Sequence, residues 1–127
     1  MSLFKSRVIH IIQAVPHGKV VSYGQVATYA GVPRAARQVG WILNRSEGKV
    51  DLPWWRVINN EGRISIKGTK YNDRELQRKL LQAEGIEVSE ELHVSMPRYR
   101  FIASVQQLTE FELSKSYIDT IMLKYQL

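Results

Sequence analysis

The sequence predicts a mainly α-helical domain that contains a helix-turn-helix and one small β-hairpin. Three observations predict this fold class. Apolar residues recur at helical spacing near both ends of the chain. Between them, two short segments with helix start and stop signals are separated by a turn that contains Gly31 and Pro33, as in a helix-turn-helix. Residues 55–59 and 63–66 have strand-like composition and flank a short turn that ends in glycine.

Length and composition indicate one globular domain and exclude several kinds of chemistry. The chain has 127 residues, of which 44% are hydrophobic and 24% charged. No apolar run approaches the roughly 20 residues of a membrane span, and the start lacks a signal-peptide cleavage pattern, so we expect a cytoplasmic protein, nucleoid-associated if bacterial. The absence of cysteine excludes disulfides, thiolate metal sites and covalent chemistry at a thiol. Three isolated histidines match no metal-binding spacing, so we expect neither a metal nor a cofactor.

The first two helices have clear boundaries. An amphipathic helix opens the chain and is ended by Pro16. The second helix, over 23–30, begins with a capping box formed by Ser22 and Gln25 and ends at Gly31. The apolar stripe of the first helix is expected to consist of Phe4, Val8, Ile11, Ile12 and Val15.

The third helix is predicted to have a basic outer face. It has Pro33 in its first turn and runs to about Arg45. The inward residues are expected to be Ala36, Val39, Gly40 and Leu43. The outward residues are expected to be Arg34, Arg37, Gln38, Trp41 and Arg45. Arginines with an aromatic ring favour phosphate contacts combined with stacking, although a basic helix face is often simply solvated.

A fourth helix is predicted to follow the hairpin. Asn72 and Glu75 signal its start, and Gly85 with Ile86 signals its end. Its shared face is expected to be Leu76, Leu80 and Ala83.

Residues 101–127 are expected to form a C-terminal helical appendage to a domain of residues 1–100. Between positions 84 and 119 seven acidic residues accompany three basic ones, so the sign of the charge changes there. A helix start is signalled by Ser116 and Asp119. The residues at helical spacing after that signal are Ile118, Ile121, Met122 and Tyr125.

Positive charge is concentrated in the first half of the chain. The formal net charge is +6. Residues 1–56 hold eight basic and two acidic side chains, whereas residues 57–127 hold ten of each. This asymmetry favours a surface that meets a polyanion such as nucleic acid, although a solvated basic face would have the same composition.

Four motifs resemble one known family. Residues 22–27 read Ser-Tyr-Gly-Gln-Val-Ala, 36–40 read Ala-Arg-Gln-Val-Gly, 52–59 read Leu-Pro-Trp-Trp-Arg-Val-Ile-Asn and 80–85 read Leu-Leu-Gln-Ala-Glu-Gly. In order and spacing they resemble the C-terminal domain of the O6-alkylguanine-DNA alkyltransferases over about residues 3–86. The resemblance implies the winged-helix-like DNA-binding fold of that domain.

The third motif departs from the family at its reactive residues. The family reads Pro-Cys-His-Arg-Val, in which the cysteine accepts the alkyl group and the histidine activates it. Here Trp54 and Trp55 occupy those two positions, and no other thiol exists. Hydroxyl groups stay protonated near pH 7, so alkyl transfer is excluded. The chain therefore resembles the alkyltransferase-like proteins, a non-enzymatic branch that binds duplex DNA containing alkylated guanine, flips the damaged nucleotide and hands the lesion to nucleotide excision repair.

The resemblance assigns roles to individual residues. Arg37 matches the arginine that enters the base stack from the minor groove, and Tyr23 matches the tyrosine that promotes rotation of the target nucleotide. The implied lesion pocket consists of Tyr23, Trp54, Val57 and Lys67. The implied DNA contacts are Tyr23, Arg34, Arg37, Gln38, Trp41 and Arg45. Arg56 is expected to brace its loop, and Glu84, without a histidine partner, is expected to have only a structural role.

Two other functions are compatible with parts of the sequence. A helix-turn-helix transcription factor would use the third helix but would leave the Pro-Trp-Trp-Arg-Val stretch without a role. A base-excising glycosylase would need an acid or amine in the pocket, such as Glu84 or Lys67. We expect a monomer whose partners are damaged duplex DNA and nucleotide excision repair proteins, without membrane association.

Overall fold

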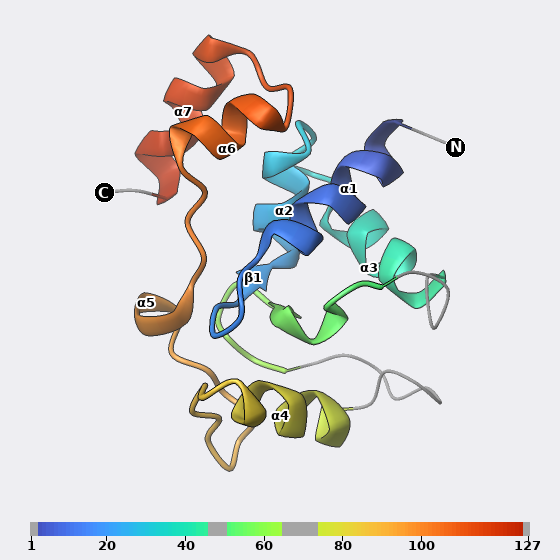
Figure 1. Ribbon diagram of the computed structural model, residues 1–127, viewed down its shortest axis with the longest axis vertical. Helices are drawn as coiled ribbons and strands as arrows, with labels where there is room; N and C mark the ends of the chain where they lie inside the picture. Colours follow the sequence, from blue (N-terminus) through green and yellow to red (C-terminus); the bar gives the residue numbers. More distant parts are fainter. Residues whose placement is uncertain (1–2, 46–50, 65–73, 126–127) are drawn as a thin grey trace.

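The described part of the chain is mostly helical with one small sheet, as the sequence predicts. A computed structural model describes residues 3–45, 51–64 and 74–125 (Figure 1). The elements in chain order are α1 (Leu3–Ala14), β1 (Val21–Ser22), α2 (Tyr23–Tyr29), α3 (Ala36–Arg45), the 3-10 turn η1 (Trp54–Arg56), β2 (Val57–Ile58), α4 (Arg74–Ala83), α5 (Met96–Tyr99), α6 (Val105–Glu110) and α7 (Lys115–Tyr125). Within these ranges, none of the helices is long and apolar enough to cross a membrane.

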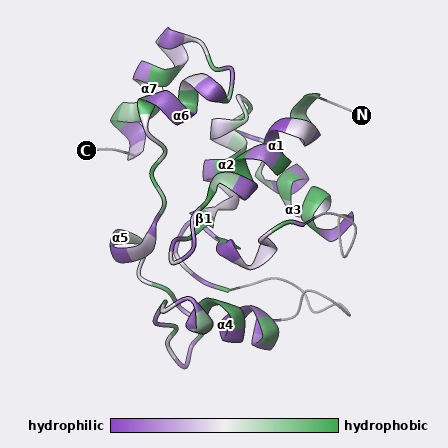
Figure 2. Ribbon diagram, in the orientation of Figure 1, coloured by the Kyte–Doolittle hydropathy of each residue, from purple (hydrophilic) through white to green (hydrophobic). Residues whose placement is uncertain are grey.

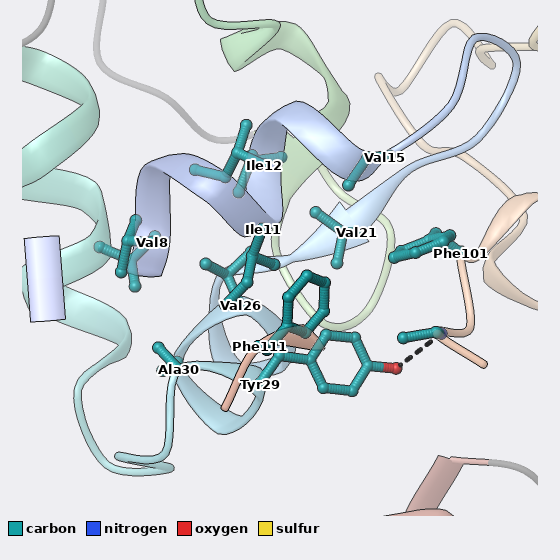
Figure 3. Close-up of a cluster of buried hydrophobic side chains, with 14 of the residues drawn as sticks. Val8, Ile11, Ile12, Val15, Val21, Val26, Tyr29, Ala30, Phe101 and Phe111 are labelled. Carbon is teal, nitrogen blue, oxygen red and sulfur yellow. Dashed lines mark hydrogen bonds between the residues drawn. The ribbon is translucent and has the colours of Figure 1, made fainter. Parts of the chain in front are cut away.

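The main hydrophobic core lies between α1, α2, α3 and the C-terminal segment (Figure 3). The predicted stripe of α1 is confirmed, because Val8, Ile11 and Ile12 have no exposed surface. Tyr29 of α2 and Phe111, which follows α6, join the same cluster with ring centroids 6.2 Å apart. Figure 2 shows hydrophobic and hydrophilic residues alternating along α1, α3 and α4, as expected for helices with one buried face.

The helix-turn-helix is formed by α2 and α3. Ser22 Oγ accepts the Gln25 backbone N–H at 3.0 Å, and Gln25 Oε1 accepts the Ser22 N–H at 3.3 Å, so the predicted capping box is confirmed. Gly31 follows α2 with φ +91°, a left-handed conformation that side chains disfavour. This glycine turns the chain out of α2 and toward α3.

The third helix begins later than predicted. We expected Pro33 in its first turn, but α3 starts at Ala36. A hydrogen bond of 3.0 Å from the Ala35 N–H to the Val32 carbonyl closes a separate turn before the helix. Arg34 therefore lies on this turn and not on the helix itself.

The small sheet is a parallel pair, not the expected hairpin. β1 pairs with β2 so that Val21 lies opposite Val57 and Ser22 opposite Ile58. β1, which follows α1, therefore occupies the place beside β2 that we had expected residues 63–66 to occupy. Because β1 leads directly into α2, the sheet ties the start of the helix-turn-helix to η1.

A turn does form at residues 60–62, but the chain after it pairs with a segment that follows α4. The Asn59 side-chain oxygen accepts the N–H groups of Glu61 and Arg63 at 3.0 and 2.8 Å. Arg63 then forms an antiparallel bridge with His93, beyond α4. Gly62 fits so tightly against the Val94 carbonyl oxygen that a Cβ would lie 2.1 Å from it. The end of the expected second strand, 65–66, lies outside the described residues.

The buried face of α4 differs from the expected one. Gln77 and Leu81 are buried, whereas Leu76 is 37% exposed and Ala83 is also exposed. Leu81 belongs to a second hydrophobic cluster of Val20, Ile58, Ile64, Leu81, Ile86, Val94, Met96 and Tyr99. The predicted end of α4 is confirmed by Gly85, at φ +85°, and by the buried Ile86. The predicted start at Asn72 lies outside the described residues.

Residues 101–125 pack into the same core as α1 and α2. Phe101, Leu108 and Ile118 are all buried in the main cluster. The Ser114 side chain caps α7 by accepting the Tyr117 N–H at 3.2 Å, so the predicted cap at Ser116 is wrong. In Figure 1, α6 and α7 lie beside the end of the domain formed by α1 and α2.

Candidate nucleic-acid interface

The outer face of α3 presents the residues predicted from the sequence. Val39 and Leu43 are buried, so they fix the helix on the core. Trp41 is 58% exposed, which is unusual for so large an apolar ring. The predicted outward residues are all exposed, and they are Arg34, Arg37, Gln38, Trp41 and Arg45.

Trp41 and Arg45 form a pair one helical turn apart. The Arg45 guanidinium carbon lies 5.8 Å from the centroid of the Trp41 ring, a cation–π distance. Arg37 precedes Trp41 by one turn on the same side of the helix. The outer face therefore carries an aromatic surface between two cations, which suits contact with both phosphates and bases.

Tyr23 begins α2 next to this face. It directly follows the Ser22 cap and is half-buried against the main core. A Cβ added to Gly40 of α3 would lie 4.0 Å from the Tyr23 ring, so the two helices meet there in ordinary contact. Burial raises the pKa of the Tyr23 hydroxyl. A tyrosine hydroxyl is protonated at physiological pH even at its ordinary pKa, so it is a neutral donor that does not repel a phosphate.

The two tryptophans of η1 lie edge to face. Their ring centroids are 6.0 Å apart with an interplanar angle of 88°. Trp54 is half-buried and packs against the main core. Val57, expected in the pocket, is 0% exposed and sits in the central pairing of β1 with β2, so it lies in the core. Lys67 lies outside the described residues.

Glu84 has a partner that the sequence reasoning missed. The Trp55 indole Nε1–H donates to Glu84 Oε2 at 2.7 Å. We had expected this carboxylate to lack a ring partner because no histidine is present. An indole N–H is a hydrogen-bond donor as an imidazole N–H is, and this shared property was the available signal.

Further donors surround the Glu84 carboxylate. Arg56 donates to it from Nε and Nη2, at 2.8 to 3.1 Å, and the Gly18 amide donates to Oε1 at 2.8 Å. Arg56 also reaches the Val15 carbonyl at 2.9 Å, as expected of a residue that braces the loop. We call Trp55, Arg56 and Glu84 the Glu84 cluster.

The Glu84 cluster holds its carboxylate ionised. Burial by itself raises the pKa of Glu84, but the hydrogen bonds from Arg56, Gly18 and Trp55 and the charge of Arg56 outweigh it, so the pKa lies below its usual value. The Glu84 and Arg56 side chains are only 6% and 14% exposed. Among the residues that the structure describes, no group of three or more histidines, aspartates or glutamates is placed to hold a metal ion.

Comparison with known proteins identifies the family. The model for the DNA-binding domain of 6-O-methylguanine DNA methyltransferase matches residues 3–86. A DNA base-flipping protein of Escherichia coli is 47% identical over 98 residues, which are 77% of this chain and 74% of that protein. Alkyltransferase-like protein 1 of Schizosaccharomyces pombe is 34% identical over 103 residues, covering 78% of this chain and 94% of the relative.

A solved structure has the same fold. Schizosaccharomyces pombe Atl1, in complex with damaged DNA containing O6-carboxymethylguanine, matches with a TM-score of 0.74 at 33% identity. The match covers 81% of this chain and 98% of Atl1. This chain belongs to the alkyltransferase-like branch of the family defined by the DNA-binding domain of 6-O-methylguanine DNA methyltransferase.

Proposed function

We propose that this protein is a non-enzymatic sensor of alkylated guanine in duplex DNA. It binds the duplex through α3, rotates the damaged nucleotide out of the stack and holds it against Trp54. The observation that carries the proposal is the structural likeness to Atl1, which was solved in complex with DNA containing O6-carboxymethylguanine. The present chain has this likeness and contains no cysteine. A chain without a thiol has no soft nucleophile to take up an alkyl group.

The geometry of the outer face supports this binding mode. Arg37 is exposed on α3, and a planar guanidinium that enters the stack can both stack on the unpaired base and hydrogen-bond to it. Tyr23 lies where α2 meets α3, and its neutral hydroxyl can approach the phosphate of the rotating nucleotide. Trp54 offers an aromatic surface that accepts alkyl groups of different size, because stacking requires no fixed hydrogen-bond pattern.

Handover to nucleotide excision repair is part of the proposal and rests on the family resemblance. A protein that cannot remove the alkyl group needs a second system to repair the DNA. We also propose a cytoplasmic, monomeric protein. Glycosylase chemistry at Glu84 is disfavoured because this carboxylate is nearly buried and already accepts hydrogen bonds from Gly18, Trp55 and Arg56. Lys67, the other candidate for that chemistry, lies outside the described residues.

Equilibrium binding tests the proposal. A duplex with one O6-methylguanine and its undamaged twin are titrated by fluorescence anisotropy at one salt concentration. We expect tighter binding to the damaged duplex, whereas equal affinity would favour a general helix-turn-helix DNA-binding protein. After incubation, mass spectrometry should recover both DNA strands and the protein unchanged, and a released base would instead favour the glycosylase.

A further inference from the structure

Trp55 is held at three points. Its indole N–H donates to Glu84 at 2.7 Å, and its main-chain carbonyl accepts from the buried Gln77 side chain at 3.0 Å. The Arg56 guanidinium carbon lies 5.5 Å from the centroid of its ring. The half-buried ring also packs against the second hydrophobic cluster. The ring therefore has one defined orientation.

The group that anchors the indole is itself fixed. The Glu84 carboxylate follows α4 and accepts from the Gly18 amide, which belongs to the loop after α1. Arg56 links the same carboxylate to the Val15 carbonyl. The orientation of Trp55 thus depends on Arg56 of its own turn and on groups that follow α4 and α1.

Trp55 in turn restrains Trp54. The two rings lie edge to face, and Trp54 packs against the main core while Trp55 packs against the second cluster. If Trp55 lost its anchor, its ring could rotate and the edge-to-face contact would be lost. The Trp54 ring would then sample more orientations.

We infer that Trp55 is a positioning residue for lesion recognition, which fixes the Trp54 ring through its hydrogen bond to Glu84. The inference rests on the proposed function, because it concerns the aromatic surface on which an alkylated guanine is read. The exposed cations proposed to meet phosphates, Arg34, Arg37 and Arg45, lie on α3 and the turn before it and take no part in the Glu84 cluster. Loss of the anchor should therefore reduce discrimination between damaged and undamaged DNA and leave general DNA affinity intact.

Two substitutions at Trp55 separate positioning from packing. Trp55→Phe keeps an aromatic ring and removes the N–H donor. Trp55→His restores a ring N–H that can reach Glu84. We expect Trp55→Phe to lower the ratio of undamaged to damaged Kd about fivefold or more, because the Trp54 ring loses its fixed orientation, and Trp55→His to stay within about twofold of the wild type, because its ring N–H can still donate to Glu84.

A measurement without DNA keeps the inference independent of the proposed function. With 5-fluorotryptophan incorporated, the 19F resonance of Trp54 in the free protein should shift or broaden in Trp55→Phe and return toward the wild-type position in Trp55→His. If Trp55→Phe does not fold, Glu84→Gln is the alternative variant. It removes the carboxylate charge and should shift or broaden the Trp54 resonance in part. An unchanged Trp54 resonance together with an unchanged Kd ratio in folded Trp55→Phe would overturn the inference. A wild-type protein that binds both duplexes equally would instead overturn the proposed function.

Discussion

Trp54 and Trp55 are neighbours in the chain but pack on different hydrophobic clusters. Their short turn therefore lies where the two clusters of the domain meet. The Glu84 cluster closes this junction with a nearly buried ion pair. An ion pair of this kind is costly to break on one side, because the remaining charge is left without its partner. The residues around the aromatic pair are thus restrained by electrostatics as well as by packing.

Substitution of Arg37 should affect damaged DNA selectively. Arg37→Ala is expected to weaken binding to the O6-methylguanine duplex by about 1 to 3 kcal/mol, because the stacked guanidinium is lost. Binding to the undamaged duplex should change little, and fluorescence anisotropy measures both. Arg34→Ala is the matched control, since a phosphate contact on the preceding turn should weaken both complexes alike. Lesion affinity that is unaffected by Arg37→Ala would refute the role of Arg37.

The Glu84 cluster should make stability depend on pH. Because the folded-state pKa of Glu84 is lowered, its contribution to the free energy of unfolding is complete above the ordinary value of 4.5 and is lost as the pH falls toward the folded-state pKa. Glu84→Gln should therefore flatten the fall in stability below pH 4.5 in urea denaturation. Glu87→Gln, at a side chain that is 77% exposed, is the control and should leave the profile unchanged. Parallel profiles for Glu84→Gln and the wild type would contradict this account.

At the scale of elements, α2 is held by contacts from the far end of the chain. The Gln25 side chain donates to the Phe101 carbonyl and accepts from Arg100 at 3.0 Å. The Tyr29 hydroxyl accepts the Ala103 N–H at 3.2 Å. A helix of seven residues has little stability of its own, so these contacts help to fix the helix that begins with Tyr23.

The contact from α7 gives a direct test of this support. The Tyr117 hydroxyl donates to the Thr28 carbonyl of α2 at 2.7 Å. Tyr117→Phe should lower the free energy of unfolding by about 1 kcal/mol, the usual contribution of one hydrogen bond. Leu123→Ala, at a side chain of α7 that is 74% exposed, should change stability by less than about 0.5 kcal/mol. Equal effects of the two substitutions in urea denaturation would show that α7 does not support α2 in this way.

Local signals in the sequence predicted α1, α2 and the end of α4, but they did not predict the short helices α5 and α6 or the pairing of the sheet. The Ser22–Gln25 capping box and the stop at Gly85 depend on residues three or four positions apart, so the sequence contains all the information needed. The partner of β2 is β1, 36 positions away in the paired register, and no local pattern specifies such a pairing. The turn at 60–62 was found correctly, but its strand-like flanks do not determine what they pair with.

A polar residue in the interior accounts for the difference at α4. Gln77 is buried because its side chain donates to the carbonyls of Trp55 and Val57, at 3.0 Å each. A pattern of apolar residues does not reveal a buried face that contains a glutamine. We therefore predicted wrongly that Leu76 and Ala83 face the interior. The outer face of α3 was predicted correctly, since its amphipathic pattern is strong and its inner residues are all apolar or glycine.

At the scale of the whole molecule, the uneven charge should govern affinity for DNA. The net charge of +6 comes from residues 1–56, which include the helix-turn-helix. If α3 and its flanks neutralise about four to six phosphates, a plot of log K against log salt should have a slope of about −4 to −5. Binding titrations at salt concentrations from about 50 to about 200 mM would measure this slope. A slope flatter than about −2 would remove DNA as the main partner.

The central claim is that the protein flips an alkylated guanine out of the duplex without modifying it. Fluorescence of 2-aminopurine placed opposite O6-methylguanine tests this claim most directly, because the emission of this base rises when it loses its stacked and paired neighbours. Saturating wild-type protein should raise the emission from the damaged duplex and leave that of the undamaged duplex nearly constant. Emission that stays the same in both duplexes at saturation would contradict the account.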